Sequence, residues 1–274
     1  MTTKKIAKIA LEEAFNLPDI DNSNNNFTAP NGAKDLGAQL VDIHEQRLKG
    51  MDENGVSYMI LSLTAPGPQG ETNPEAAQAL AERANNYLAG EIGKNPARFG
   101  GFAALSMHDP KSAALEARRA IKELGFHGLL VNDFQSTGAD GEGAIFYDQP
   151  EWDIFWEEVQ ALDVPFYIHP RLTTPAVTKL FLDGRPWLRG ATYFFSVGRN
   201  ISITTSGHYG TPSLLFAIQE LGIDRVLFSI DYPYETIDEG PKWFDSITEL
   251  TEDQKKQIAF GNAEKLLKLS PFPK

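Results

Sequence analysis

The apolar and polar positions of the chain predict short buried strands that alternate with amphipathic helices. The clearest strand is 226–230, where a near-continuous apolar run of β-branched and aromatic residues is typical of a parallel strand covered on both faces. Similar runs occupy 6–11, 56–63, 98–105, 127–131, 164–169 and 201–205. Helical spacing occupies 40–54, 74–92, 110–124, 150–162, 211–221, 240–247 and 252–269. This alternation predicts right-handed βαβ units and a parallel sheet.

The number of units favours a closed barrel over a doubly wound sheet. Five strand-and-helix units precede residue 170, and no glycine-rich dinucleotide fingerprint follows any of the strands. We count seven strands, one fewer than a complete (β/α) barrel requires. The sequence therefore predicts an α/β fold of the TIM type, incomplete or distorted, in a single domain that covers residues 1–274.

Three predicted strands end on side chains that commonly bind metals. Glu12 ends the first strand, His169 ends the fifth, and Asp231 ends the last. In a closed barrel the first and last strands are neighbours, so these side chains would face one mouth. Two carboxylates and an imidazole with an open position suit a catalytic Zn²⁺ or Mn²⁺.

Each of these residues also has a simpler interpretation. Asp231 could cap the turn that precedes Tyr232-Pro233, and Glu12 could be a solvated carboxylate at the rim of the barrel. His169 could be a core histidine whose ring is satisfied by the backbone. The coincidence of all three on one face of the barrel favours the metal site. His208, at the predicted end of the strand at 201–205, is a further candidate for a catalytic or supporting residue.

Composition narrows the range of partners. Acidic residues outnumber basic ones by 37 to 25, and the formal charge of −12 argues against nucleic acid or an anionic membrane as a partner. The chain has no cysteine, which excludes disulfides and a thiolate metal site. The N-terminal residues lack the apolar run of a signal peptide, and we expect a cytoplasmic protein.

Several motifs, taken together, resemble one enzyme family. They are residues 9–15 (IALEEAF), 147–152, 155–171 ending in PFYIHPR, 203–208 (ITTSGH), 227–233 (LFSIDYP) and 261–269 (GNAEKLLKL). This set is similar to the non-oxidative aromatic acid decarboxylases of the amidohydrolase superfamily, which include the 2,3-dihydroxybenzoate, γ-resorcylate and salicylate decarboxylases. The resemblance covers nearly the whole chain.

The resemblance implies a lyase that removes CO₂ from an ortho-hydroxybenzoate to give a phenol, using one divalent metal ion, Zn or Mn. Glu12, His169 and Asp231 match the family's metal ligands, and Asp231 would deliver a proton to the ring carbon that bears the carboxylate. Some members carry a further histidine where this chain has Ala14. The family also implies a homo-oligomer and a small aromatic carboxylic acid as the substrate.

Four further positions are expected to hold the substrate ring by hydrogen bonds and stacking: Phe27, Thr64, Asn132 and Phe194. For the two phenylalanines, apolar packing within the protein is an equally good interpretation.

The chain departs from the family between Gly198 and Arg199. There the family has a further unit with the sixth barrel strand, a Gly-His-x-Gly-Glu motif and flanking helices, roughly 50 to 60 residues long. Because the missing histidine is a catalytic residue of the family, we expect this chain alone to be poorly active or inactive. Two alternatives remain open, a metal-dependent hydrolase of a lactone or amide, and a non-catalytic barrel fragment that assembles with a full-length relative.

Overall fold

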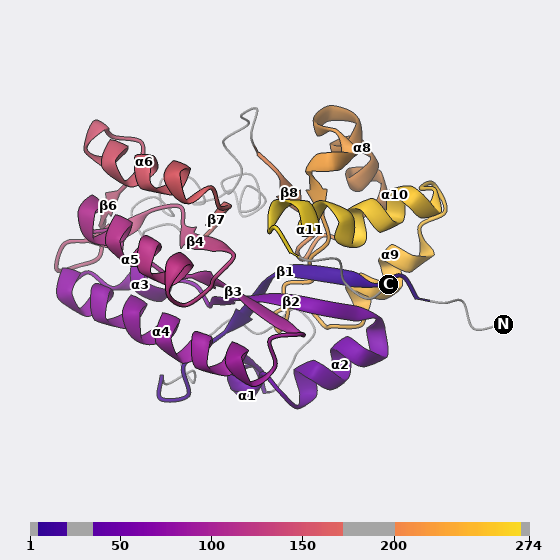
Figure 1. Cartoon of the computed structure of the whole chain (residues 1–274), viewed down its shortest axis with the longest axis horizontal. Coiled ribbons are helices and arrows are strands. Elements are labelled where there is room, and N and C mark those ends of the chain that lie inside the picture. The colour runs from indigo at the N-terminus through magenta and orange to yellow at the C-terminus, as the bar shows by residue number, and fades with distance from the viewer. Residues whose placement is uncertain (1–4, 21–34, 172–200, 270–274) are drawn as a thin grey trace, which may run out of the picture. The chain divides into compact units, whose positions relative to one another are not determined.

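The structure is a computed structural model that describes residues 5–20, 35–171 and 201–269. Figure 1 labels its helices and strands. The chain divides into two compact units. Unit 1 consists of Met1–Ser62, Gly90–Gly101 and Asn200–Lys274, and unit 2 of Leu63–Ala89 and Phe102–Arg199. The expectation that residues 1–274 form one domain stays a prediction.

Unit 1 contains the first and the last strands of the chain. Strand β1 (Lys8–Phe15) lies beside β2 (Val56–Leu63), and β2 runs parallel to the first half of β3 (Phe99–Ala103). A separate parallel pair is formed by β8 (Ile203–Thr204) and β9 (Val226–Leu227). The helical segments of this unit are α1 (Leu36–Val41), α2 (Gln46–Asn54), α8 (Thr211–Leu221), η4 (Ile223–Arg225), α9 (Glu239–Ser246), α10 (Glu252–Lys256), the π-helix η5 (Gln257–Gly261) and α11 (Asn262–Leu266).

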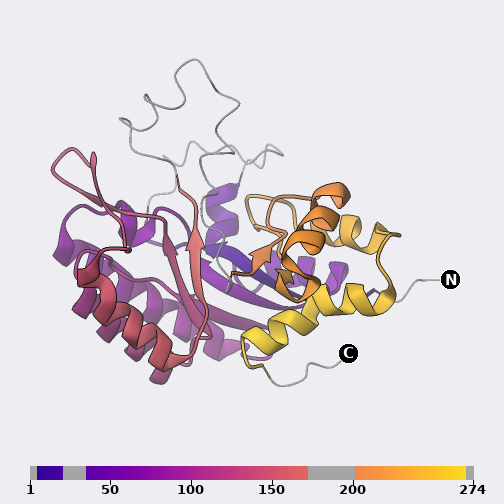
Figure 2. The same ribbon diagram turned by 90° about the horizontal axis from the view of Figure 1, so that it is seen from above.

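In unit 2, β3 pairs with β4 (Gly128–Asn132), and β4 pairs with β7 (Phe166–His169). Both pairs are parallel. Its helices are α3 (Gly67–Gly70), the part of α4 (Pro74–Lys94) up to Ala89, α5 (Pro110–Lys122), η1 (Pro150–Trp152) and α6 (Asp153–Leu162), and α5 packs against α6. A short hairpin of β5 (Gln135–Thr137) and β6 (Gly143–Ile145) follows β4. Figure 2 shows the same elements turned by 90°.

The predicted parallel strands and their order along the chain are confirmed, whereas some element boundaries are wrong. The expected helix 40–54 is two helices, because the Asp42 side chain ends α1 and accepts hydrogen bonds from the backbone N–H groups of Glu45 (3.0 Å) and Arg47 (3.1 Å). The expected helix 252–269 is interrupted by η5. The hairpin β5–β6 and helix α3 were not predicted.

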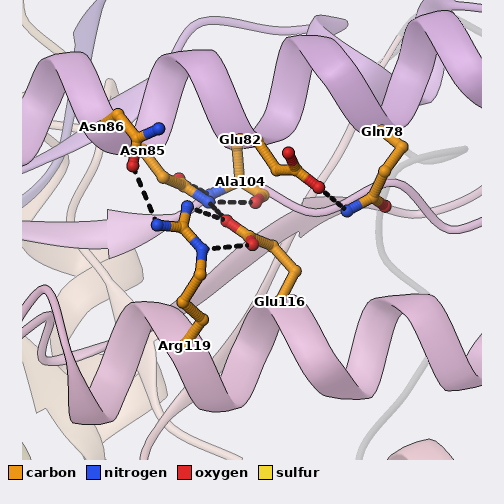
Figure 3. A network of polar contacts seen from close by, with 7 residues as sticks. All are labelled: Gln78, Glu82, Asn85, Asn86, Ala104, Glu116 and Arg119. Atoms are coloured by element: carbon orange, nitrogen blue, oxygen red, sulfur yellow. Dashed lines mark hydrogen bonds and ion pairs between the residues drawn. The ribbon is translucent and has the colours of Figure 1, made fainter.

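One buried asparagine connects two helices of unit 2 to the end of β3 (Figure 3). Asn85, 1% exposed on α4, donates to the Ala104 carbonyl (2.9 Å) and accepts from the Ala104 N–H (2.9 Å). It also donates to Glu116 on α5 (2.7 Å), whose carboxylate is paired with Arg119 (2.8 Å). Every polar atom in this contact has a partner, as the low dielectric of a protein interior requires.

A buried lysine fixes the start of β1 in unit 1. Lys8 is fully buried, and its ammonium donates to Asp245 Oδ1 (2.8 Å) and to the Ile6 carbonyl (3.0 Å). The rings of Phe228 and Phe244 lie 6.0 and 5.9 Å from Nζ. Burial lowers the pKa of Lys8, and the hydrogen bond and charge of Asp245 oppose that shift.

We expect the two partners of this ion pair to respond unequally to removal. Asp245→Ala should cost about 3 to 5 kcal/mol, because it leaves an ammonium buried without its counterion. Lys8→Met should cost less, since the Asp245 side chain is 31% exposed and can be hydrated. Urea unfolding of both variants measures the difference, and a larger loss for Lys8→Met would contradict this account.

In the part of the chain that the structure describes, none of the helices combines the length and the apolar character needed to cross a membrane.

Candidate functional site

The two adjacent glutamates of β1 have different surroundings. Glu12 is 8% exposed and accepts a hydrogen bond from Thr204 Oγ1 on β8 (3.0 Å). Glu13 is fully buried and accepts from the backbone N–H groups of Ile230 (3.0 Å) and Tyr232 (2.9 Å). Successive side chains of a strand point to opposite faces, which separates the two carboxylates. Glu13 thus holds the backbone on both sides of Asp231.

A buried arginine interacts electrostatically with Glu13. Arg47 on α2 is fully buried and donates to the carbonyls of Ala14 (2.7 Å) and Asp42 (3.1 Å). Its guanidinium lies 4.7 Å from the centre of the Tyr232 ring. Burial raises the pKa of Glu13 to about 7, although the backbone hydrogen bonds and the Arg47 charge oppose this shift.

Asp231 follows the last strand in an unusual backbone conformation. Its φ is 75°, and that of Glu12 is 94°. Both residues therefore lie at positive φ, a backbone conformation that residues other than glycine adopt only at a cost in free energy. Burial raises the pKa of Asp231 to about 9, and the negative charges of Glu12, Glu13 and Glu235 add to the shift.

The repulsion among these carboxylates is of the kind that a divalent cation relieves. A bound cation would reverse the electrostatic penalty that raises the pKa of Asp231, and oxygen donors suit Mn²⁺. Glu12 and Asp231, which come from opposite ends of the chain, both belong to unit 1, and the charge of Glu12 contributes to the pKa shift of Asp231.

His169 and Asn132 end neighbouring strands of unit 2, where they are partners in the register of β4 and β7. Asn132 Nδ2 lies 3.4 Å from His169 Nδ1 and donates to the His169 carbonyl (3.3 Å). The Asn132 N–H donates to Oε1 of Gln69 (3.2 Å). Thr64, 7% exposed, directly follows β2.

His208 is not at a strand end. Strand β8 ends at Thr204, and His208 lies exposed in the following turn, where its N–H donates to the Thr205 carbonyl (3.0 Å). Its side chain lines a small cavity beside α8 with Ser213 and Ala217. Its expected catalytic or supporting role stays a prediction.

The complete three-ligand metal site also stays a prediction. Glu12 and Asp231 belong to unit 1 and His169 to unit 2, and each unit is described by itself. Among the described residues, no three His, Asp or Glu side chains form a group that could hold a metal ion. Phe27, Phe194 and the junction at Gly198 lie outside the described residues.

Sequence reasoning missed a polar cluster beside His169. Arg171 Nη1 donates to the Gln69 carbonyl (2.7 Å), and its guanidinium lies 4.3 Å from the centre of the Phe134 ring. Asp133 and Tyr147 interact electrostatically with Arg171. The only signal in the sequence was the position of Asp133 and Arg171 just beyond two strand ends.

The family model for amidohydrolases matches residues 30–269. The chain belongs to this amidohydrolase family. Within it, the chain is similar to the non-oxidative aromatic acid decarboxylases, as its motifs predicted.

Two characterised relatives are similar in sequence to this chain. A γ-resorcylate decarboxylase of Polaromonas sp. is 36% identical over 96% of this chain and 99% of its own length. A γ-resorcylate decarboxylase of Rhizobium sp. is 36% identical over 96% of this chain and 98% of its own length.

Solved structures agree with this assignment. A 2,6-dihydroxybenzoate decarboxylase in complex with 2,6-dihydroxybenzoate has a TM-score of 0.86 and 35% identity, over 96% of this chain and 99% of the other. A dihydroxybenzoic acid decarboxylase of Polaromonas sp., with bound manganese and the inhibitor 2-nitroresorcinol, also has a TM-score of 0.86 and 35% identity, over 96% and 97%. The predicted fold class, a TIM-type barrel that is incomplete or distorted, is confirmed.

This chain is shorter than its relatives in the interior. The alignment with the Polaromonas relative spans 327 positions, whereas 96% of 274 residues is about 263, so about 64 positions of the relative have no counterpart here. That difference has about the size of the strand-and-helix unit that the sequence predicts to be missing between Gly198 and Arg199.

Proposed function

We propose that this chain is a divalent-metal-dependent carboxy-lyase that converts an ortho-hydroxybenzoate into the corresponding phenol and CO₂. The observation that carries the proposal is the similarity over 96% of the chain to γ-resorcylate decarboxylases. The paired carboxylates of Glu12 and Asp231 support it, because they offer the oxygen donors that Mn²⁺ prefers.

We assign the metal to Glu12, Asp231 and His169, with Mn²⁺ or Zn²⁺ as the ion. A metal bound there would supply positive charge that attracts the anionic substrate and stabilises negative charge on its oxygens. Asn132, whose side chain contacts His169, would orient that imidazole and face the substrate ring. Thr64, Phe27 and Phe194 are the other proposed ring contacts.

Asp231 is the proposed acid. It gives its proton to the ring carbon that carries the carboxylate, the bond between this carbon and the carboxylate carbon breaks, and the electrons of that bond restore the aromatic ring. CO₂ leaves, and Asp231 is reprotonated from solvent. His208 is the candidate for a second proton-transfer group.

The proposal is tested by incubating the manganese-loaded chain with 2,6- and 2,3-dihydroxybenzoate. Release of CO₂ with formation of resorcinol or catechol is expected. Opening of an aromatic lactone without CO₂ release would favour a hydrolase instead. Activity that appears only after mixing with a full-length relative would favour the barrel fragment.

The missing unit is expected to limit the rate. A displacement of about 1 Å at a catalytic group can cost on the order of a hundredfold, and the family's histidine is absent as well. A chain with a family-type strand and helix inserted after Gly198 should therefore release CO₂ at least about a hundredfold faster at equal metal content. Equal rates for the two chains would show that the shorter form is a complete enzyme.

A homo-oligomeric state and a cytoplasmic location are further proposals, made from the resemblance and from the composition of the sequence.

A further inference from the structure

Among the buried polar atoms of unit 2 that lack hydrogen-bond partners within the described residues, three belong to one cluster: Asp133 Oδ1, Tyr147 OH and Arg171 Nε. Buried polar atoms of native proteins are nearly always paired with protein, water or ligand. The three side chains interact electrostatically with one another, yet these atoms make no hydrogen bond to each other. A group outside the described residues, such as a bound ligand, would satisfy them.

The surrounding structure holds this cluster firmly. Tyr147 is 7% exposed, its ring packs edge-on against Trp152 at 5.2 Å, and its carbonyl accepts from Trp156 Nε1 (2.7 Å). The Arg171 guanidinium is fixed by the Gln69 carbonyl and by the Phe134 ring. Such preorganised polar groups are typical of a binding site and cost little to order when a ligand arrives.

The cluster adjoins residues that the proposed function uses. Asp133 directly follows Asn132 at the end of β4, and Arg171 lies two residues after His169 at the end of β7. Asp133 also interacts electrostatically with His169. The cluster therefore lies at the carboxyl ends of these strands, the edge where α/β barrels bind their substrates.

The chemistry of the three atoms selects the ligand group. Arg171 Nε–H donates, Asp133 Oδ1 accepts, and the Tyr147 hydroxyl can do both. A carboxylate would be repelled by Asp133 and a cation by Arg171. A neutral hydroxyl group can donate to Asp133 while it accepts from Tyr147 or Arg171.

We propose that Tyr147, Asp133 and Arg171 form a subsite for a second ring hydroxyl of the substrate. This hydroxyl is distinct from the ortho-hydroxyl that defines the substrate class of the proposed function. The inference rests on the proposed function, and it makes a dihydroxybenzoate the substrate class. Tyr147 and Asp133 are then the residues that distinguish a dihydroxybenzoate from 2-hydroxybenzoate. A site built to bind a hydroxyl discriminates strongly against an analogue that lacks it.

The test is equilibrium binding of manganese-loaded protein to 2-hydroxybenzoate and to its 2,3-, 2,4-, 2,5- and 2,6-dihydroxy relatives, measured by calorimetry. At least one dihydroxy isomer should bind roughly tenfold or more tightly than 2-hydroxybenzoate. Tyr147→Phe, which keeps the packed ring, should remove most of that preference without weakening 2-hydroxybenzoate. Asp133→Asn, which keeps an oxygen acceptor but loses the charge, should remove part of it.

A matched control is Tyr58→Phe, which deletes another buried phenol hydroxyl in unit 1 and should leave the preference unchanged. Equal weakening of all ligands by Tyr147→Phe, or the absence of any preference in the unaltered chain, would overturn the proposal, since a bound water would then suffice. Because binding is measured apart from CO₂ release, a chain that binds with this preference, but releases no CO₂ even when it is completed after Gly198, would refute the proposed reaction and leave the subsite standing.

Discussion

Replacing Asp231 with asparagine is expected to lower CO₂ release by about 10²- to 10⁴-fold, because the variant loses the proposed acid. The same substitution removes a charged metal ligand, so the manganese content of protein purified without chelator should fall below about a tenth of an equivalent. Elemental analysis and product detection on one preparation measure both effects. If CO₂ release by the short chain is too slow to measure, the same substitution is assayed in the chain with a family-type strand and helix inserted after Gly198.

Asp253→Asn is the matched control, because the Asp253 side chain is 98% exposed and lies on α10. It should change neither the metal content nor the rate. Full metal content in Asp231→Asn would refute the assignment of Asp231 as a ligand. Full metal content with a normal rate would refute its role as an acid too.

Glu13→Ala should destabilise the protein by on the order of 3 to 5 kcal/mol. The substitution leaves the buried N–H groups of Ile230 and Tyr232 without their carboxylate acceptor, whereas the Ser229 hydroxyl keeps its shorter hydrogen bond to the Leu11 carbonyl (2.6 Å). Each orphaned group costs about 1 to 3 kcal/mol. Urea unfolding of the metal-free protein measures the loss.

The neighbouring substitution Glu12→Ala is the comparison that isolates this role. Glu12 accepts a hydrogen bond from the exchangeable hydroxyl of Thr204 rather than from buried backbone N–H groups around Asp231, and removing its charge relieves repulsion with Asp231. Its cost in the metal-free protein should stay within about 1 kcal/mol, while metal binding is lost. Similar stability losses for the two variants would contradict the division of roles.

The metal site of Glu12, Asp231 and His169 stays a prediction, whereas the order of the elements could be predicted from the sequence, because buried parallel strands are near-continuous apolar runs. Their extents were harder to predict. The apolar run 226–230 is a strand only over Val226–Leu227, since the Phe228 N–H turns to the Ile258 carbonyl at 3.2 Å. Such a partner, 30 residues further along, leaves no trace in local periodicity.

The polar cluster of Asp133, Tyr147 and Arg171 could not be predicted for a related reason. Its members come from three separate segments, and the hairpin β5–β6 that precedes Tyr147 is too short to show an alternating pattern. Likewise, Glu12 and Glu13 are chemically identical in sequence. Only the partners of each carboxylate, Thr204 for one and the backbone around Asp231 for the other, reveal which is structural.

The left-handed backbone at Glu12 and Asp231 sets a cost that the rest of the fold must offset. At a positive φ, glycine would relieve a strain of about 1 to 3 kcal/mol, whereas this chain carries an acidic side chain at each of the two positions. The hydrogen bonds that Glu13 accepts from the N–H groups of Ile230 and Tyr232 hold the backbone on both sides of Asp231, and they help to maintain that conformation.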